Sequence, residues 1–409
     1  MIDVDSESFL TVVSVAAIAA FVAGLAPRSL PLPVVVIEIV LGIVVGPEII
    51  GLAHPDEFLE FFSSLGLGML FFFAGYEIDF DRIRGSPLRL AVLARLMSLA
   101  IAYALGGALA LAGVVLSLVF VGSAMATTAI GTLIPILSDA GELRTRFGTY
   151  LLAAGAVGEF GPILLITLVF STKSALGNAL ILLVFVAVAV VAAVGAMRGV
   201  GYGYEALQRS LETSGQLAIR LAVVVIFTLA TLAATLGLDL LLGGFVAGVI
   251  VRMALKGREV SIFESKLTAV GYGFLIPFFF VVSGINFHLS ALVDDPITLL
   301  ELPLFLALFL VVRGLPALLL YTRDLDRRDR LALGIFSATQ LPLVVAITTI
   351  AVDQGHMRSS TAASLVGAGI LSTTIFPLVA LRLRAGARES EEPAISSAAT
   401  TVAPAKEAH

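Results

Sequence analysis

Two ionisable side chains stand far from either end of long apolar stretches, where a charge is costly to keep. Glu159 lies near the middle of the apolar run 147–171, and Arg313 lies well inside the run 299–321. Glycines and a proline flank the carboxyl group, in the segment Gly155-Ala-Val-Gly-Glu-Phe-Gly-Pro162. Small neighbours leave space for an ion or a water molecule beside the carboxyl group.

The carboxyl group of Glu159 is suited to carry either a proton or a metal cation. Burial disfavours its ionised form, whereas a nearby cation favours that form. A carboxyl group balanced between these effects binds H⁺ or a cation such as Na⁺ or K⁺. We therefore predict Glu159 to be a proton carrier and a metal ligand. The alternative is a structural ion pair or an acid that reaches out to the membrane surface.

Arg313 needs a partner, because it is too far from either end of its apolar run to reach water easily. Glu159 is the candidate. An ion pair between the two would be broken whenever a cation or a proton occupies the carboxylate. Two structural roles stay open for the arginine: it would compensate carbonyl groups at a helix end, or it would lock neighbouring helices together.

Two further apolar runs, 115–138 and 329–352, have polar centres with a proline. The polar and helix-disturbing residues are Thr127, Thr128, Gly131, Thr132 and Pro135 in the first run and Ser337, Thr339, Gln340 and Pro342 in the second. Each proline removes a backbone hydrogen bond, which predicts an interruption near the middle of each helix. Interrupted helices expose carbonyl groups and half-helix dipoles that hold ions. The alternative is an ordinary proline kink satisfied by threonine hydroxyls.

The composition shows what kind of element must position these side chains. Of 409 residues, 59% are hydrophobic and 13% are charged, and the mean hydropathy is +1.06. Such a surface cannot cover a soluble enzyme, so lipid contact is expected. The chain has no cysteine and four histidines, which disfavours a Cys- or His-ligated metal centre. We find no nucleotide-binding or hydrolase motif, and we expect no cofactor, no nucleic-acid partner and no appended nucleotide-binding domain.

Thirteen apolar runs predict thirteen transmembrane helices. All 25 basic residues fall in predicted cytoplasmic segments, except Lys173 and Arg358 outside and Arg95 and Arg313 within spans. This distribution places the N-terminus (1–8) outside and a disordered tail (388–409) in the cytoplasm, with a membrane domain at 9–387. The runs are 9–26, 31–50, 58–79, 88–112, 115–138, 147–171, 177–199, 217–236, 239–256, 267–288, 299–321, 329–352 and 359–381.

The chain also contains an internal repeat. Three pairs of segments match at offsets of about 200 to 212, namely 42–46 with 244–248, 66–79 with 271–288, and 122–128 with 334–340. The members of the first pair each have two glycines four residues apart, a small-residue face that predicts close contact with a neighbouring helix. Seven helices separate the members of each pair, so the halves 9–171 and 217–381 have opposite orientations, with 172–216 as linker. Inverted repeats of this kind are typical of secondary transporters that alternate access around a midplane site.

Four blocks resemble a known family. They are PVVVIEIVLGIVVGPEIIG at 33–51, LGLGMLFFFAGYEID at 65–79, LGGFVAG at 242–248 and PFFFVVSG at 277–284. The chain resembles the monovalent cation:proton antiporter superfamily, which carries a sodium/hydrogen exchanger domain, and within it the bacterial Kef-type and NapA-like branch. The resemblance implies an all-α homodimer of thirteen-helix subunits. Each subunit would have a dimerisation scaffold and a mobile core in which two unwound helices cross.

The resemblance also implies roles for individual residues. Glu159 matches the family's ion-binding Asp and Arg313 its core Lys or Arg. The centres of the crossing helices correspond to Thr127, Thr128, Thr339 and Gln340. The chain has Gly158-Glu159 where the family usually has Asn-Asp or Asp-Asp. A single acid favours electroneutral exchange and leaves the choice between Na⁺ and K⁺ open.

We therefore expect an antiporter of the bacterial cytoplasmic membrane, not an enzyme, that exchanges protons for Na⁺ or K⁺ by alternating access. A cation channel with the same fold is the nearest alternative. A sodium-coupled organic-anion symporter is another, in which Arg313 would bind the anion. An intramembrane enzyme is disfavoured, because one midplane acid lacks a catalytic partner.

Overall fold

The structure, a computed structural model, describes the backbone of residues 5–25, 33–77, 83–143, 145–170, 175–236, 238, 240–255, 260–293 and 296–399. Within these ranges, the description excludes the side chains of residues 135, 138–139, 159–170, 175–179, 182, 199–202, 240–241, 293, 297 and 385–399.

All regular structure in the described part is helical, and the chain passes through the helices in one order. They are α1 (Ser6–Leu25), α2 (Val34–Val45), α3 (Glu57–Tyr76), α5 (Ser86–Leu111), α6 (Leu118–Met125), α7 (Ile130–Asp139), α8 (Arg146–Phe170), α9 (Ala175–Leu211), α10 (Leu217–Thr235), α11 (Leu240–Leu255), α12 (Ser261–Val270), the π-helical turn η1 (Gly271–Leu275), α13 (Ile276–Ile285), α14 (Leu289–Val293), α15 (Pro296–Leu320), α16 (Arg327–Ser337), α17 (Pro342–Asp353) and α18 (Ser359–Ala399).

Helices occur at the place of every predicted span. Within the described residues, eight helical segments are long and apolar enough to cross a membrane, or nine if the bent α9 is one span. Shorter apolar helices lie at Val34–Val45, Leu118–Ile134 and Leu242–Leu255. The all-α polytopic class is confirmed, whereas the count of thirteen spans stays a prediction.

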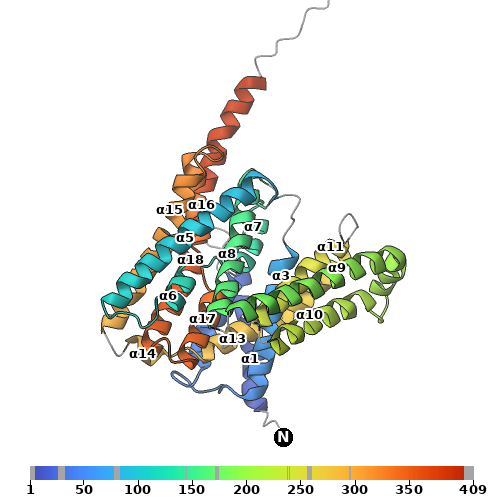
Figure 1. Cartoon of the computed structure of the whole chain (residues 1–409), viewed down its shortest axis with the longest axis horizontal. Helices are drawn as coiled ribbons and strands as arrows, with labels where there is room; N and C mark the ends of the chain where they lie inside the picture. The colour runs from blue at the N-terminus through green and yellow to red at the C-terminus, as the bar shows by residue number, and fades with distance from the viewer. Residues whose placement is uncertain are drawn as a thin grey trace, which may run out of the picture.

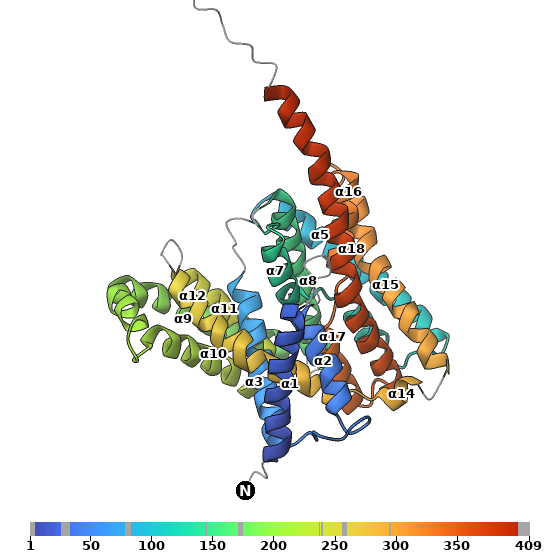
Figure 2. The same ribbon diagram turned by 180° about the vertical axis from the view of Figure 1, so that it is seen from behind.

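The helices form two bodies that share the middle of the molecule. Figure 1 shows α5–α8 and α14–α18 gathered on one side, and α9–α11 reaching out on the other. Seen from behind in Figure 2, α1, α2 and α3 stand between these groups, and α18 projects beyond the bundle. We call α5–α8 with α14–α18 the core, and α1–α3 with α9–α13 the scaffold.

The scaffold is held by helices that touch through their backbones. A Cβ added at Gly42 of α2 would lie 2.3 Å from the carbonyl oxygen of Val281 in α13, and one at Gly248 of α11 would lie 2.0 Å from that of Phe72 in α3. The predicted repeat relates α2 to α11 and α3 to α13. It therefore maps the contact between α2 and α13 onto the contact between α11 and α3. Its small-residue faces therefore make the close contacts that the sequence predicts.

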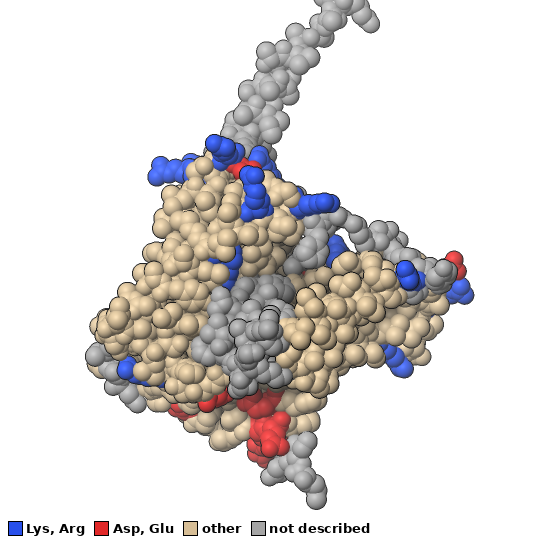
Figure 3. Space-filling view, in the orientation of Figure 1, with Lys and Arg blue, Asp and Glu red and all other residues tan. Residues whose placement is uncertain are grey.

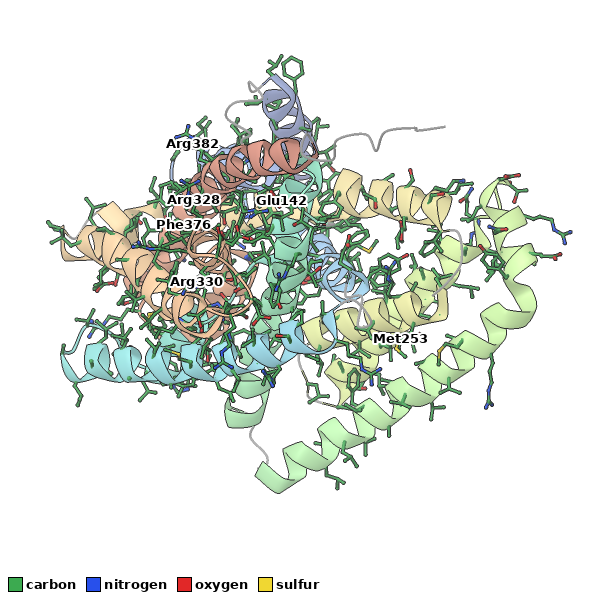
Figure 4. All side chains as sticks on the ribbon, turned by 90° about the horizontal axis from the view of Figure 1, so that it is seen from above. Glu142, Met253, Arg328, Arg330, Phe376 and Arg382 are labelled. Atoms are coloured by element: carbon green, nitrogen blue, oxygen red, sulfur yellow. The ribbon has the colours of Figure 1, made fainter. Side chains whose placement is uncertain are left out.

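Charged side chains gather at opposite ends of the molecule. Figure 3 shows the basic side chains mostly at the end from which α18 projects and the acidic ones at the end where α1 begins. Viewed from above in Figure 4, Arg328, Arg330 and Arg382 lie over α15–α18, and Met253 lies on α11, away from them. At this basic end Arg384 of α18 pairs with Asp329 and, at 3.2 Å, with Glu142.

The first part of the predicted C-terminal tail, 388–409, belongs to α18. This helix continues to Ala399, into the segment predicted to be a disordered tail. Residues 400–409 lie outside the described part of the chain, as does the predicted N-terminal segment up to residue 4. The predicted domain boundaries therefore stay predictions.

Candidate functional site

Two broken helices meet in the middle of the core. The helix α6 ends at Met125 and α7 begins at Ile130, whereas α16 ends at Ser337 and α17 begins at Pro342. The extended segments between them lie side by side, because the backbone N–H of Ala129 donates to the carbonyl oxygen of Thr339 at 2.8 Å. We call this region, 126–129 with 338–341, the crossing.

The two interruptions were predicted, but the cause of one was predicted wrongly. Pro342 occupies the first turn of α17, where its missing N–H costs nothing. Pro135 lies inside α7, after the break rather than at it. In the first helix the break coincides instead with Thr127, whose hydroxyl donates to the carbonyl oxygen of Ala124 at 3.0 Å and so competes with helical hydrogen bonding.

Gln340 joins the two broken helices through its side-chain amide. Its Oε1 accepts a hydrogen bond from the Thr127 hydroxyl at 3.1 Å, and its Nε2 donates to the carbonyl oxygen of Met125 at 2.8 Å. Thr128 links the same elements, since its hydroxyl donates to the carbonyl oxygen of Ser337 at 2.7 Å. Polar side chains therefore pair the helix-end groups that the breaks leave open.

The crossing is also fastened to α18. The backbone N–H of Gln340 donates to the Ser372 hydroxyl at 3.0 Å, and this hydroxyl donates to the carbonyl oxygens of Gln340 and Gly369. Sequence reasoning did not identify Ser372. Serine is common in the neighbouring helices, and the sequence around Ser372 has no pattern that indicates a contact with Gln340.

Arg313 of α15 lies buried beside the crossing, with 4% of its surface exposed. Its Nε donates to the Thr128 hydroxyl at 3.0 Å and to the carbonyl oxygen of Ser337 at 3.4 Å. Nη1 donates to the Ser98 hydroxyl at 3.2 Å and Nη2 to the carbonyl oxygen of Ala154 at 3.3 Å. The guanidinium group thus compensates the carbonyl end of α16 and ties it to α5 and α8, which combines the two structural roles left open above.

The helix α8 brings the predicted acid to this region. A Cβ added at Gly158 would lie 2.8 Å from Nη2 of Arg313 and 3.0 Å from the Thr128 hydroxyl oxygen, so the backbone of α8 passes directly against the crossing. The next residue is Glu159, whose side chain lies outside the described residues. The predicted ion pair between Glu159 and Arg313 is therefore untested.

A second arginine, Arg95 of α5, is buried at the same place with 4% of its surface exposed. Its Nη1 donates to the carbonyl oxygen of Ala126, directly after α6. Each half-helix that ends at the crossing therefore has an arginine at its carbonyl end. The sequence contained one signal for Arg95, its position inside a predicted span, but its location nearer a helix end made a structural role the default.

Three hydroxyl groups near the crossing have no hydrogen-bond partner among the described residues. They belong to Thr132 of α7, Thr339 at the crossing and Thr373 of α18, and all three residues are buried. Hydroxyl oxygens are suitable ligands for a hard monovalent cation. No group of three or more His, Asp and Glu side chains is arranged as a metal site in the described part of the chain.

A cavity of about 730 Å³ leads toward this region from the acidic end of the molecule. It lies between α3 and α13 of the scaffold and α17 and α18 of the core. Val345, in the first turn of α17 after the break, is part of its wall. The polar residues that line it are Glu48, Glu60, Ser63, Ser64, Ser283, Asn286, His288, Thr348, Thr349, Asp353 and Ser359.

The chain is similar to a known protein family over most of its length. The family described as "Sodium/hydrogen exchanger, transmembrane" matches residues 16–381. YjbQ of Bacillus subtilis, named for Na⁺/H⁺ antiport, is 26% identical over 386 residues, which are 89% of this chain and 61% of that protein. This chain therefore spans less than two thirds of that relative's length.

Two further comparisons cover most of both chains. The Na⁺/H⁺-K⁺ antiporter GerN of Bacillus cereus is 25% identical over 359 residues, 84% of this chain and 88% of that protein. The structure of the sodium proton antiporter MjNhaP1 from Methanocaldococcus jannaschii matches with a TM-score of 0.58 at 17% identity. It covers 93% of this chain and 96% of the other. This likeness confirms the fold.

Proposed function

This chain belongs to the sodium/hydrogen exchanger family of integral membrane proteins, and on that premise we propose that it exchanges H⁺ for a monovalent cation, Na⁺ or K⁺, by alternating access. The names of its relatives support this reaction, since YjbQ is named for Na⁺/H⁺ antiport and GerN for Na⁺/H⁺-K⁺ antiport. It is a transporter family, so we assign no enzymatic reaction.

The crossing is the observation that carries the proposal. It places two sets of helix-end groups, unpaired threonine hydroxyls and two arginines in the middle of a helical membrane bundle. Unwound backbone at this depth is expensive unless it lines a binding site. A cavity from one side reaches within a turn of it, as alternating access requires.

Glu159 is the proposed carrier in this exchange. A cation and a proton compete for its carboxylate, so the site can move across the membrane with either one bound and returns with the other. Thr127, Thr128, Thr339 and Gln340 support the proposal as the polar lining next to α8. Arg313 supplies a fixed positive charge beside the site, which favours the ionised form of the carboxyl group over its protonated form.

Charge balance supports one-for-one exchange. Gly158 occupies the position of the second polar partner, and it cannot hold a proton or a cation. One carboxylate that alternates between H⁺ and a monovalent cation carries the same net charge in both directions. We therefore propose electroneutral exchange, within the Kef-type and NapA-like branch.

The assembly and the orientation are part of the same proposal. The basic end of the molecule faces the cytoplasm and the acidic end faces outward, in keeping with the positive-inside rule. The cavity at the acidic end is then open to the outside. The chain functions in the bacterial cytoplasmic membrane as a homodimer, with the scaffold as the dimerising part.

The experiment is a pH-gradient collapse assay in proteoliposomes with Na⁺, K⁺, Li⁺ or choline outside. We expect wild-type protein to collapse the gradient with Na⁺ or K⁺, and Glu159→Gln to have background activity while it remains folded. Full activity in Glu159→Gln would refute its role as carrier. Arg209→Gln is the matched control, because that guanidinium is 79% exposed on the surface.

The two alternatives predict other results in the same vesicles. A cation channel of this fold would conduct Na⁺ or K⁺ without obligatory proton movement. A sodium-coupled organic-anion symporter would be stabilised by organic anions rather than by cations, with Arg313 as the anion ligand. Each of the three Arg313 nitrogens already donates to a protein acceptor, which argues against the second alternative.

A further inference from the structure

We propose that the guanidinium group of Arg95 is a second binding position for a carboxylate at the crossing. It forms an ion pair with the carboxylate of Glu159 when this group carries neither a proton nor a cation. This inference rests on the proposed function, since it assigns a resting partner to the proposed carrier. It replaces Arg313, the partner expected from sequence, by an arginine on a different helix.

The first observation is an unsatisfied, buried charge. Arg95 has 4% of its surface exposed, and its Nη1 donates to the carbonyl oxygen of Ala126. Its Nε and Nη2 have no hydrogen-bond acceptor among the described residues. A buried guanidinium group with two unpaired nitrogens is strongly unfavourable, so a partner is required in at least part of the working cycle.

The second observation is the shape of what is left free. In arginine, the N–H of Nε and one N–H of Nη2 point in the same direction and form a planar fork. That fork matches the two oxygens of a carboxylate, which accepts both hydrogen bonds at once. The free face of Arg95 is therefore a complete bidentate carboxylate site rather than a single spare donor.

The third observation is the contrast with Arg313. Each of its nitrogens already donates to a protein acceptor, namely to Thr128 and Ser337, to Ser98, and to Ala154. A carboxylate that approached Arg313 side-on would have to displace hydrogen bonds that hold the crossing. Arg95 offers the same charge without that penalty.

The packing brings Arg95 and α8 to one place. Ser98 lies three residues after Arg95 on the same face of α5, and its hydroxyl accepts a hydrogen bond from Arg313. Arg313 in turn lies against Gly158, the residue before Glu159. Both guanidinium groups contact the crossing, Arg95 at Ala126 and Arg313 at Thr128. A carboxylate between them lowers their mutual repulsion.

This arrangement gives Arg95 a role in exchange. When the carboxylate has released its cargo, the fork of Arg95 stabilises the charge that would otherwise stay bare in the bundle. An arriving Na⁺ must displace this fork to bind. Arg95 is thus a positioning residue that competes with the cation, and its removal should change affinity as well as rate.

The direct test is a double-mutant cycle on thermal unfolding of the purified full-length protein in detergent, in sodium- and potassium-free choline buffer. The four proteins are wild type, Arg95→Gln, Glu159→Gln and the double variant. We expect the double variant to unfold about 3 °C higher than the sum of the single effects, because it removes both members of a pair. The same cycle with Arg313→Gln should be nearly additive with Glu159→Gln. Additivity in the Arg95 cycle would overturn the inference.

A chemical probe separates an internal carboxylate from an external anion. Acetate at high concentration should raise the unfolding temperature of Glu159→Gln, whose fork is vacant, and not that of the variant that also lacks Arg95. If acetate stabilised wild type as much as Glu159→Gln, the fork would be a site for a free anion, and the assignment to Glu159 would be wrong.

Transport supplies a readout that a purely structural arginine would not change. Arg95→Gln should lower the apparent KM for Na⁺ about tenfold and also lower kcat, since a bidentate charged hydrogen bond no longer competes. Arg95→Lys keeps the charge but lacks the fork, so its KM should lie between the two. An unchanged KM in both variants would refute the competition. If wild type showed no exchange while the unfolding cycle remained non-additive, the proposed function would fail and the pairing would stand.

Discussion

In the scaffold, α2 lies against α13 and α3 against α11 with backbone touching backbone, whereas in the core a set of side-chain hydrogen bonds joins the broken helices, beside the backbone hydrogen bond from Ala129 to Thr339. At Gly42 and Gly248 no space is left for even one more carbon atom. At the crossing, Gln340, Thr128 and Arg313 bridge gaps between carbonyl and hydroxyl groups. The close contacts of the scaffold leave no space for a ligand, whereas the crossing is lined by polar groups.

This difference separates two tasks. Close glycine packing resists deformation, because interiors at full density respond to added volume with strain. A hydrogen-bonded junction of broken helices costs more to bury, but it presents oxygen atoms and charges to an ion. We infer that substitutions in the scaffold change how much folded protein exists, whereas substitutions at the crossing change what the folded protein transports.

The largest effect is expected at Arg313. Arg313→Gln leaves several buried acceptors without a donor and removes the charge at the end of α16, so we expect a loss of about 4 kcal/mol in stability and a loss of transport. Arg313→Lys keeps the charge and should restore part of both. Unfolding and proteoliposome flux are measured in parallel. Wild-type flux in folded Arg313→Gln would remove the distinction between the two regions.

A scaffold glycine should affect stability alone. Gly248→Ala places a Cβ about 2.0 Å from the Phe72 carbonyl oxygen, which cannot yield without moving α3. We expect a loss of about 3 kcal/mol in detergent unfolding, with normal exchange per folded molecule.

The matched control for that variant is Gly107→Ala in α5. No atom lies within 4 Å of a Cβ added at Gly107, so this change should stabilise the helix by about 0.5–1 kcal/mol. If both variants behaved alike, close backbone contact would not be what holds the scaffold.

An intermediate effect is expected at Gln340. Gln340→Leu removes the link between Thr127 and the carbonyl oxygen of Met125, leaving both without this partner. We expect about 2 kcal/mol of destabilisation and a roughly tenfold lower exchange rate. Thr235→Val, on the exposed side of α10, removes a hydroxyl that bonds only its own helix and should change neither. Equal effects of the two variants would contradict the account.

The smallest effect concerns pH at the basic end of the core. Asp324, between α15 and α16, accepts hydrogen bonds from the hydroxyls of Tyr150 at 2.6 Å and Ser86 at 3.0 Å. The Tyr150 bond first, and the Ser86 bond with it, hold the pKa of Asp324 below its ordinary value. The carboxyl is largely hydrated, so the gain is about 0.5 kcal/mol.

The sign of this contribution follows from the lowered pKa. The stabilisation is complete above the unfolded-state pKa of about 3.9 and is lost as the pH falls through the folded-state value. Asp324→Asn should therefore be slightly less stable than wild type at pH 6, and the difference should shrink as the pH falls below about 4. A difference that grew on acidification would contradict this assignment.

Local patterns in the sequence predicted much of this comparison. The glycine faces of 42–46 and 244–248 predicted the scaffold contacts, because small residues at that spacing have few other uses in membrane helices. Polar centres with weak helix formers predicted both breaks. The assignment of Pro135 to one break failed, because the helix ends upstream of it, at the threonine-containing segment, and Pro135 itself lies inside α7.

The partners across the core could not be predicted. Ser98, Ala154 and Ser372 act through contacts between residues distant in sequence, and serine or alanine in a membrane helix carries no distinguishing pattern. Arg95 was visible as a charge within a span, but only its unpaired nitrogens distinguish it from a structural residue. The count of thirteen spans remains a prediction, and the pair of Glu159 with Arg313 expected from the sequence, for which we propose Arg95 instead, is untested.

The most direct test of the proposed exchange is a simultaneous measurement of radioactive Na⁺ uptake and internal pH in proteoliposomes at zero and at imposed membrane potential. We predict that Na⁺ enters only as protons leave, one for one, at a rate independent of the potential, and that Glu159→Gln abolishes both fluxes. Sodium uptake without proton movement, or persistence of coupled fluxes in Glu159→Gln, would contradict the account.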